Sequence, residues 1–454
     1  MPINIILKLA EKFKSLSGRL LLTGGQVRDN IRAGTFNFGQ VRGDFDFLAL
    51  GLDMQKILAA ARTVGPARVV VRKSGPSGQP SLVRLRQGPA GFDISPPKSC
   101  GEVGLGDLDR VLEQDALERD FTVNSIYYDP LDRRIYDPLG GMESLAARRL
   151  ALCSSEAVEK DPLRLLRAMV LISRRGFTAS GAFLKTAQAS RSLLSRVAPD
   201  RFWPEWRRWS LAGQPHLGLW FLWETGLIKF WPSLAKLADV PQVRRFHPEG
   251  DAFKHTVLVV QAMSELRLPE PERRAHLTLA ALLHDIGKPV VIKFNEYGKP
   301  ITSGHSSAGV AVARDFLRSV RAPEEIVKKV ARLVRWHMEL AFKPITGPDL
   351  RAVARKLEPY ADLVDFWAVS AADWNGRRPL FEMYPYSLAE FLEPVAGEIK
   401  AARPPLDGAD LIRLCNFSPG PEIGQALKKL ARAYDSGEVK THGEALEFVR
   451  RKDG

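Results

Sequence analysis

"RGDFDFLAL", residues 42–50, places two carboxylates, Asp44 and Asp46, one residue apart in an otherwise apolar run. Side chains alternate between the two faces of an extended strand, so Asp44 and Asp46 share one face and Phe45 and Phe47 share the other. Two neighbouring like charges each raise the cost of the other unless a cation compensates them. The spacing therefore points to a divalent metal ion. The alternative for the pair on its own is a solvated strand face.

Residues before and after this pair point the same way. In "LLLTGGQVRD", residues 20–29, Gly24 and Gly25 lie between a predicted strand and a predicted helix. Bare backbone N–H groups and a helix N-terminus can bind a phosphate there, although a glycine pair alone is more often a turn. Asp93 in "GPAGFDIS" supplies a third carboxylate on a later strand. Three carboxylates on neighbouring strands can hold two Mg²⁺ ions and so support phosphoryl transfer.

Composition sets the broad class. The chain has 454 residues, 45% hydrophobic and 26% charged, which suits a globular protein of roughly three domains. No apolar run approaches the roughly 20 residues that span a bilayer, and no signal-peptide cleavage site follows the first helix, so we expect a cytoplasmic protein without a membrane partner. The net charge of +14 favours a polyanionic partner, nucleic acid first. Cys100, Cys153 and Cys415 lie too far apart for a CxxC metal site and argue against a disulfide framework.

Hydrophobic periodicity predicts an α+β fold, with a small mixed head followed by an all-helical body. Strands are predicted at 19–25, 45–50, 67–73 and 81–88, and helices at 26–34 and 54–64. From about residue 155 the pattern is helical almost throughout. A long helix is predicted to open at "DPLRLLRAMV", with Asp161 as its N-cap and Pro162 at its first position. Thr441 and Glu444 form the capping box of a final helix.

The segment "ERDFTVNSIYYDPLDRRIYDPLGGMESL", residues 118–145, offers further polar groups. Arg119 can hold a triphosphate, and Asp120 and Asn124 can bond ribose hydroxyls. The alternative is a surface ion pair and a helix cap.

Taken in order, the motifs GGxVRD, DxD, RDFTxN, DPLGG and DPLRLLRA resemble those of the bacterial class II tRNA nucleotidyltransferase and poly(A) polymerase family. The similarity is close over the first 240 residues and continues through an embedded HD domain and a helical tail. It implies a polymerase-β-like nucleotidyltransferase head at 1–150 and a helical neck that binds base and RNA at 151–240. An HD phosphohydrolase-like domain at 241–395 and a tail at 396–454 would follow.

The resemblance implies a template-independent polymerase that adds C, C and A to the 3′ end of tRNA from CTP and ATP, releasing pyrophosphate. Asp44 and Asp46 would be the metal-binding catalytic pair, with Asp93 as third carboxylate and Mg²⁺ as cofactor. The nucleotide would be bound by Gly24, Gly25, Arg28, Arg119, Asp120, Asn124, Asp161, Arg164 and Arg167. Asp161 and Arg164 would present acceptors and donors to the Watson–Crick edge of C or A, and an i,i+3 ion pair at a helix start is the alternative.

Two kinds of departure from the family accompany these matches. The family usually has Arg where this chain has Glu118, and a carboxylate where it has Lys160. Residues 95–112 look short and lack the aromatic residue of the family's flexible loop, which helps the switch from C to A. An enzyme that adds only CC or only A therefore stays open, as does a poly(A) polymerase.

Histidines gather in residues 247–337, and the adjacent His284 and Asp285 resemble the core of an HD phosphohydrolase. The four-ligand set of that family would be His255, His284, Asp285 and Asp373. His305 and His337 would complete a second metal site, and Lys288 would hold a phosphate. Imidazole and carboxylate suit Mn²⁺, Ni²⁺ or Co²⁺, or Mg²⁺ with more waters. The implied second activity is a phosphatase or phosphodiesterase on nucleotide or tRNA-end phosphates; His216, His276 and His442 are expected to be structural.

The tryptophans at 203, 206, 209, 220 and 223 recur at helical spacing, which favours core packing over base stacking. Basic residues near "ARRLAL", "RRW" and "KKLARA" are expected to follow the phosphates of the tRNA acceptor arm. Two readings of another class also remain: an RNA-binding protein with an inactive head, and a protein whose main activity is the HD hydrolase. The paired acids argue against the first, and the head motifs argue against the second.

Overall fold

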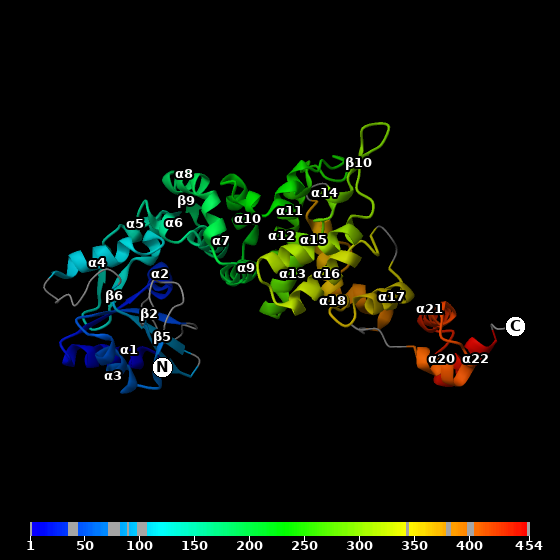
Figure 1. Ribbon diagram of the computed structural model, residues 1–454, viewed down its shortest axis with the longest axis horizontal. Coiled ribbons are helices and arrows are strands. Elements are labelled where there is room, and N and C mark those ends of the chain that lie inside the picture. The colour runs from blue at the N-terminus through cyan, green and yellow to red at the C-terminus, as the bar shows by residue number, and fades with distance from the viewer. Residues whose placement is uncertain are drawn as a thin grey trace. The chain divides into compact units, whose positions relative to one another are not determined.

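The computed structural model describes residues 2–34, 44–70, 82–88, 90–97, 107–341, 345–377, 383–396 and 404–451. The chain divides into two compact units (Figure 1). The first comprises Met1–Val197 with Glu224–Leu227, and the second comprises Ala198–Trp223 with Ile228–Gly454. The predicted turn "SGPSGQP" and Cys100 lie outside the described residues.

A seven-stranded mixed sheet forms the base of the first unit, in the order β3-β4-β5-β2-β1-β6-β7. Neighbouring strands are antiparallel except β2 and β5, which are parallel. The strands are β1 (Arg19–Thr23), β2 (Phe45–Leu50), β3 (Ala67–Val70), β4 (Leu82–Gln87), β5 (Ala90–Ser95), β6 (Tyr127–Asp129) and β7 (Arg134–Tyr136). The sheet and the helices after it confirm the predicted α+β class.

Helices cover both faces of this sheet (Figure 1). On one face, α1 (Pro2–Ser15) and α3 (Met54–Arg62) pack over Phe45, Phe47 and Phe92, which are fully or almost fully buried. On the other face, α4 (Leu108–Leu117) packs over Leu48 and Leu50. Because side chains alternate along β2, Asp46 projects to the α4 face, and the two faces predicted for this strand are confirmed.

The first unit continues with short elements around two neck helices. The short elements are α2 (Gly25–Arg32), α5 (Gly141–Ala146), β8 (Arg149–Leu150), α6 (Ala157–Lys160) and β9 (Thr178–Ala179). The two neck helices are α7 (Arg164–Arg175) and α8 (Gly181–Ala189). The prediction that Asp161 caps the long helix is wrong, because α7 begins at Arg164 and Asp161 ends α6. Asp161 has the extended angles usual before proline, φ −149° and ψ 95°, but Pro162 and Leu163 form a turn before the regular helix begins.

The second unit is helical apart from a small hairpin of β10 (Lys293–Phe294) and β11 (Pro300–Ile301). Its longer helices are α9 (Phe202–Ser210), α10 (Pro215–Glu224), α12 (Ala252–Glu265), α13 (Pro271–Leu283), α15 (His305–Ser319), α16 (Glu324–Trp336), α17 (Gly347–Leu357) and α18 (Leu363–Asn375). Among the described residues, three short helices and a C-terminal group of three complete it: α11 (Pro232–Ala235), α14 (Lys288–Val291) and α19 (Leu388–Leu392), then α20 (Gly408–Cys415), α21 (Pro421–Ser436) and α22 (His442–Arg450). The capping box of Thr441 and Glu444 is confirmed at the start of α22.

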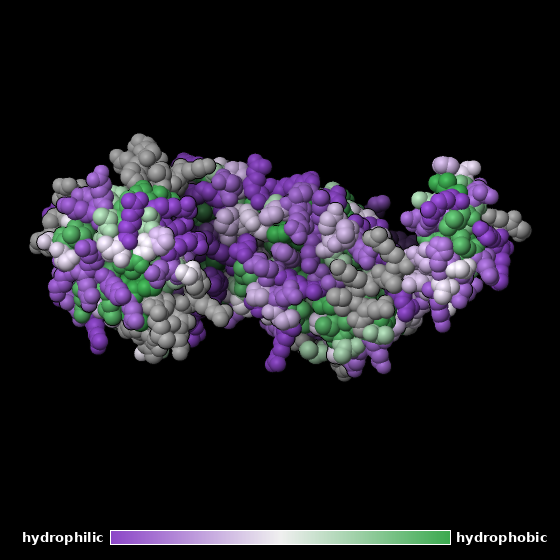
Figure 2. Space-filling model, turned by 90° about the horizontal axis from the view of Figure 1, so that it is seen from below, coloured by the Kyte–Doolittle hydropathy of each residue, from purple (hydrophilic) through white to green (hydrophobic). Residues whose placement is uncertain are grey.

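The tryptophan pattern is only partly core. Trp206 and Trp209 are fully buried and meet edge to face, as predicted. Trp220 and Trp223 are 37% and 40% exposed and lie against Phe253. Hydrophilic residues cover most of the face shown in Figure 2. Within the described residues, no helix is both long enough and apolar enough to cross a bilayer.

Candidate active sites in the two units

The carboxylates of the head lie on adjacent strands. The parallel pairing of β2 with β5 sets Asp46 directly opposite Asp93, so both project from the same face. Asp44 lies one residue before β2, and its Oδ1 lies 2.3 Å from where a Cβ on Gly91 would be. The glycine in β5 therefore leaves the space that the Asp44 carboxylate uses.

Arg84 on β4 neutralises the third carboxylate. Its Nε and NH2 groups donate to the two oxygens of Asp93 over 2.7 and 2.6 Å. Asp44, Asp46 and Asp93 do not form a group of three with ligand atoms all within 4.8 Å; in the part of the chain that is described, such groups occur only in the second unit. The guanidinium of Arg84 is therefore a cation beside the three acids.

The GG turn lies against the same carboxylates. Gly24 has φ +75°, a conformation that L side chains rarely adopt, and a Cβ there would lie 3.0 Å from Asp46 Oδ2. Helix α2 begins at Gly25, so its first N–H groups face the acidic strand end. The neighbouring Thr23 Oγ1 is buried and has no hydrogen-bond partner among the described residues.

A cavity of about 210 Å³ opens beside this turn. Eight predicted residues line it: Gly24, Gly25, Asp46, Arg119, Asp120, Asn124, Arg164 and Arg167. Asp115, which the sequence did not single out, also lines it. The other predicted head residues, Arg28, Asp44, Asp93 and Asp161, lie outside its wall.

A chain of polar contacts runs from the GGxVRD helix to α7. Arg28 NH1 donates to Asn124 Oδ1 over 2.6 Å, and Asn124 Nδ2 donates to Asp120 Oδ1 over 3.0 Å. Arg167 then pairs with Asp120 Oδ2 at 3.2 Å. Burial opposes ionisation of Asp120, but the Arg167 charge and the Asn124 amide outweigh it and hold the pKa of Asp120 below its usual value. Asp120 is therefore an anion at neutral pH.

Arg119 is held by residues that the motif did not predict. Its Nε donates to Asp115 Oδ2 over 2.8 Å and to the Tyr127 hydroxyl over 3.1 Å, and Tyr127 itself donates to Asp115 over 2.7 Å. Burial raises the pKa of Tyr127, so the hydroxyl keeps its proton. These contacts fix the plane of the guanidinium at the cavity wall.

Arg164 is 7% exposed and only partly satisfied. Its NH2 group donates to the Glu118 carbonyl over 2.5 Å, while Nε and NH1 are buried without a hydrogen-bond partner among the described residues. A buried guanidinium with free donors costs free energy unless a ligand supplies acceptors. The Asp161 carboxylate accepts from the Leu163 N–H over 3.3 Å.

In the second unit, six predicted ligands meet where five helices begin, end or cross. His255 lies on α12, His284 and Asp285 follow α13, and the others lie on α15, after α16 and on α18. Their side chains make two groups with ligand atoms within 4.8 Å of one another: His255, His284 and Asp373, and Asp285, His305 and His337. The sequence prediction placed Asp285 with His255, His284 and Asp373, whereas the structure groups it with His305 and His337.

The imidazole orientations suit metal binding. His284, His305 and His337 each turn Nδ1 to a backbone carbonyl, over 2.7, 2.9 and 2.8 Å. This contact leaves each Nε2 as the candidate ligand atom. His284 Nε2 is buried without a hydrogen-bond partner among the described residues, and His305 Nε2 lies 3.3 Å from His337 Nε2. Nitrogen atoms placed in this way fit a divalent transition metal.

His255 has a different support. Its Nε2 lies 2.9 Å from Asp373 Oδ1, and its Nδ1 lies 2.8 Å from Glu249 Oε1. Glu249 also contacts His247 Nδ1 at 2.9 Å, and the three side chains form a third group with ligand atoms within 4.8 Å. The sequence motifs did not predict Glu249, for which the H-x-E spacing at 247–249 is the available signal.

Charge in this site is balanced by cations. Burial opposes ionisation of Asp285, but His284 and Lys288 outweigh it and hold its pKa well below the usual range. Burial likewise opposes ionisation of Asp373, where Arg377 and His255 have the same effect. Burial lowers the pKa of His337 to about 3, with the charge of His284 adding to the shift. The anionic carboxylates and the neutral His337 are the ligand forms that a metal needs. Burial opposes a charge on His284, but Asp285 outweighs it and raises the pKa of His284, so this imidazole must lose a proton when a metal binds.

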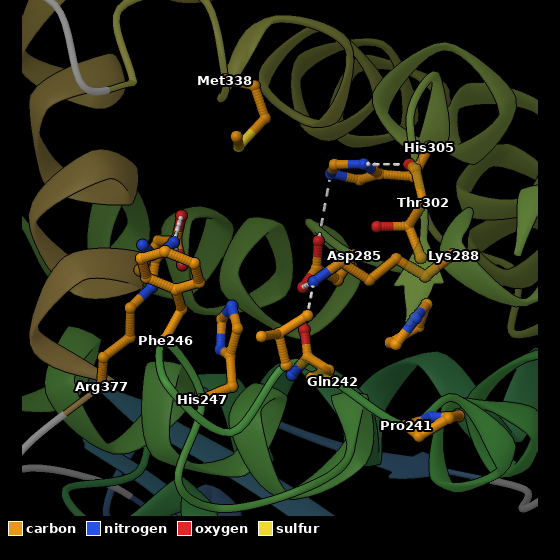
Figure 3. A pocket seen from close by; sticks show the side chains of 13 residues that line it. Pro241, Gln242, Phe246, His247, Asp285, Lys288, Thr302, His305, Met338 and Arg377 are labelled. Atoms are coloured by element: carbon orange, nitrogen blue, oxygen red, sulfur yellow. Dashed lines mark hydrogen bonds and ion pairs between the residues drawn. The ribbon is translucent and has the colours of Figure 1, made fainter. Parts of the chain in front are cut away.

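A cavity of about 400 Å³ opens onto this cluster. Figure 3 shows Asp285 between Lys288 and His305, at 2.5 and 3.2 Å, with Gln242 bonded to Lys288 over 2.6 Å. Phe246 and Met338 supply apolar surface, and Arg377 reaches the cavity from beyond α18. The ammonium group of Lys288, predicted to hold a phosphate, pairs with Asp285 in this structure.

Comparison with known proteins identifies the family. The poly A polymerase head domain matches residues 20–151, and the HD domain matches residues 252–367. The A-adding tRNA nucleotidyltransferase of Deinococcus radiodurans is 31% identical over 353 residues, 75% of this chain and 79% of that protein. The chain belongs to the tRNA nucleotidyltransferase family. It is a nucleotidyltransferase.

Other members of the tRNA nucleotidyltransferase family agree over most of the chain. The CC-adding enzyme of Thermus thermophilus is 30% identical over 437 residues, 94% of this chain and 92% of that protein. The fold also matches the solved CCA-adding enzyme of Bacillus stearothermophilus in complex with CTP, with a TM-score of 0.65 and 19% identity over 100% of this chain and 98% of that one. The fold extends over the head, the HD domain and the tail.

The two departures of this nucleotidyltransferase from its family's motifs contact each other. Lys160 Nζ lies 2.6 Å from Glu118 Oε1, so the two residues that depart from the motifs form an ion pair with each other. Glu118 also supplies the carbonyl that holds Arg164. This ion pair therefore lies next to the partly satisfied guanidinium of Arg164.

Proposed function

We propose that the head transfers CMP and AMP from CTP and ATP to the 3′ end of tRNA, adding C, C and A or part of that sequence. The observation on which the proposal mainly depends is the buried Arg164 at the wall of a cavity lined by Asp46 and the α2 N-terminus, because its Nε and Nη1 have no hydrogen-bond partner among the described residues. A nucleobase edge supplies the missing acceptors. The proposed tRNA substrate also places this activity in the cytoplasm.

Each part of the cavity fits one part of the nucleotide. The α2 N-terminus and Arg119 would bind the triphosphate, with Arg28 holding Asn124 in place. Asp120 and Asn124 would bind the ribose hydroxyls. Arg164, with Asp161 and Arg167, would bind the base edge.

The carboxylates fit Mg²⁺, since oxygen ligands on adjacent strands are what that ion prefers. Asp44 and Asp46 would hold it, and Asp93 would join them if Arg84 released its oxygens. Bound Mg²⁺ supplies charge neutralisation on the transferred phosphoryl group and activation of the attacking hydroxyl. In this structure Arg84 holds both oxygens of Asp93, which lies opposite Asp46 on the neighbouring strand.

The extent of the addition is tested with three primers. Transfer RNA lacking the CCA end, ending in C and ending in CC would each be incubated with labelled CTP or ATP. We expect C on the first two and A on the third; a CC-only or A-only enzyme extends a subset, and a poly(A) polymerase lengthens all of them with ATP. Absence of incorporation into any primer by the wild type would contradict the proposal.

The role of the acids is tested in the same assay. We expect Asp46→Asn to lower kcat by about 10²–10³-fold, the usual loss when a charge-stabilising group is removed. Asp109→Asn removes an exposed carboxylate from α4 and is the matched control, with wild-type activity expected.

A second activity is favoured by one specific observation, the convergence of His255, His284 and Asp373 with the second group at Asp285. We propose that the HD domain is a metal-dependent phosphohydrolase acting on phosphomonoesters or cyclic phosphates of nucleotides. Its test is hydrolysis of p-nitrophenyl phosphate and of 2′,3′-cyclic AMP with Mn²⁺, Ni²⁺, Co²⁺ or Mg²⁺. Asp285→Asn should abolish turnover and His442→Ala, an exposed histidine, should not; equal rates in these two variants would contradict it.

A further inference from the structure

A groove on the second unit lies outside both candidate active sites. Helices α15 and α16 pack side by side (Figure 1), and a hollow of about 590 Å³ runs along them. Its wall includes Arg314 from α15, Lys328, Arg332, Arg335 and Trp336 from α16, and Tyr360 beyond α17. We call this surface the α15–α16 groove.

The groove has an unbalanced positive charge. Arg314, Lys328, Arg332 and Arg335 make no ion pair among the described residues, and no acidic residue lines the groove.

Neighbouring cations on α15, α16 and α17 are neutralised: Arg318 by Glu324, Lys329 by Asp365, and Lys356 by Glu339. Glu324 is close enough to feel Lys328 and Arg314, but its carboxylate is already paired with Arg318. The excess charge therefore remains on the side chains that face the groove.

Aromatic rings hold several of these cations. Lys328 and Arg332 lie 5.6 and 5.8 Å from the Tyr360 ring centre, and Arg335 lies 4.1 Å from that of Trp336. The Trp336 Nε1 donor is buried without a hydrogen-bond partner among the described residues. Guanidinium groups beside aromatic faces suit RNA, because they can pair with phosphates while the rings stack on bases.

The spacing of the cations suits a strand. Lys328, Arg332 and Arg335 recur at i, i+4 and i+7, so they share one face of α16 and span ~10 Å. Each of these three cations can contact a phosphate of one RNA strand that runs along the groove. Arg314 extends the positive surface across to α15.

We propose that the α15–α16 groove binds the sugar–phosphate backbone of the tRNA substrate, as a contact surface separate from the nucleotide cavity. The proposal rests on the proposed tRNA activity and names a further part of the chain that recognises the same RNA. Recognition of this kind depends on charge and shape and is independent of base sequence.

The test compares two variants that each lose three positive charges. The groove variant carries Lys328→Gln, Arg332→Gln and Arg335→Gln, and the control carries Lys236→Gln, Lys254→Gln and Arg267→Gln, exposed positions of the same unit outside the groove. Affinity for full-length tRNA is measured from 50 to 200 mM salt. We expect the groove variant to bind at least ~10-fold more weakly and the slope of log K against log salt to fall by about 2–3, since each phosphate contact contributes ~0.7–0.9.

Measuring kcat for nucleotide incorporation distinguishes a failure of the groove proposal from a failure of the proposed tRNA activity. With saturating tRNA, the groove variant should keep the wild-type kcat for incorporation, because the nucleotide cavity is unchanged. Equal tRNA affinity in the groove variant and the control would overturn the groove proposal and leave the polymerase intact. A wild type that neither binds nor extends tRNA would overturn the proposed function itself.

A measurement on the wild type tests the groove proposal without depending on whether the variant folds. Ultraviolet cross-linking to tRNA followed by peptide mapping should place an adduct on Trp336 or Tyr360. Adducts confined to the first unit would contradict the proposal.

Discussion

At the scale of single residues, the ion pair of Glu118 and Lys160 has the clearest experimental consequence. Lys160→Glu would set two carboxylates against each other beside the carbonyl that orients Arg164. We expect kcat/KM for nucleotide incorporation to fall about 10-fold and discrimination against UTP and GTP to weaken, since contacting residues couple by roughly 0.5–3 kcal/mol.

The double variant with Glu118→Arg and Lys160→Glu restores an ion pair with the two charges exchanged. It should recover most of the lost kcat/KM. A double variant as impaired as the sum of its single changes would show that the pair does not position Arg164.

Cys153 gives a prediction about chemical reactivity. The thiol is buried, and burial together with the Asp120 charge raises its pKa to about 12. A raised thiol pKa keeps the thiol protonated until the pH approaches that value, so at pH 8 only about 10⁻⁴ of Cys153 is thiolate. In a timed iodoacetamide reaction at pH 8 with peptide mapping, Cys415, which is partly exposed, should be labelled well before Cys153. Equal labelling rates in the folded protein would contradict this.

At the scale of elements, strand β5 makes room for the catalytic pair at Gly91. A methyl group there would lie 2.3 Å from Asp44 Oδ1, the far end of a side chain that can turn away. We expect Gly91→Ala to displace that carboxylate and to lower kcat/KM by at least about 10-fold, while the melting temperature changes little.

Gly181→Ala is the matched control, because nothing lies within 4 Å of the methyl group that it would add. It should leave incorporation unchanged. Full activity of Gly91→Ala would show that Asp44 does not need its present position.

Local patterns predicted the elements better than they predicted their partners. Strands β1, β2 and β4 and helices α2 and α3 fall where periodicity and the glycine turns placed them. The bidentate contact of Arg84 with Asp93 depends on strand register, which no short motif states. The ion pair between Asp29 and Arg175 joins residues 146 positions apart, beyond the reach of any spacing rule.

In the candidate metal site too, the sequence predicted the residues themselves better than the contacts that support them. Histidines and acids in an ordered series predicted which side chains gather in the HD domain, because a shared ligand chemistry selects them. Arg377 could not be found in that way, because it contacts Asp373 and has no fixed place in a metal motif. For Glu249, which contacts His255, the sequence offered only the H-x-E spacing at 247–249.

At the scale of the whole molecule, the metal ligands come from helices spread over more than a hundred residues. His255 and Asp373 are 118 positions apart, so an ion bound between them ties α12 to α18. A ligand that binds only the folded state at 100 times its Kd stabilises that state by ~2.7 kcal/mol. For a unit of this size, the shift in melting temperature is about 5–10 °C.

Calorimetry of the full chain with Mn²⁺ or Ni²⁺, and again after chelation with EDTA, measures this effect. We expect the shift in the wild type and its loss in His284→Ala. Glu249→Gln should keep the fold and reduce the shift, since Glu249 orients His255. A metal-induced shift that persists in His284→Ala would place the ion elsewhere.

The unfilled donors of Arg164 also imply a trade-off between durability and turnover. A buried donor without an acceptor destabilises the resting protein by about 1–3 kcal/mol until a nucleobase arrives. Arg164→Met, of similar length but without those donors, should melt at a higher temperature than the wild type and no longer select its nucleotide. Selection for robustness alone would remove this arginine, so its presence means that the resting enzyme is held below the stability its fold could reach.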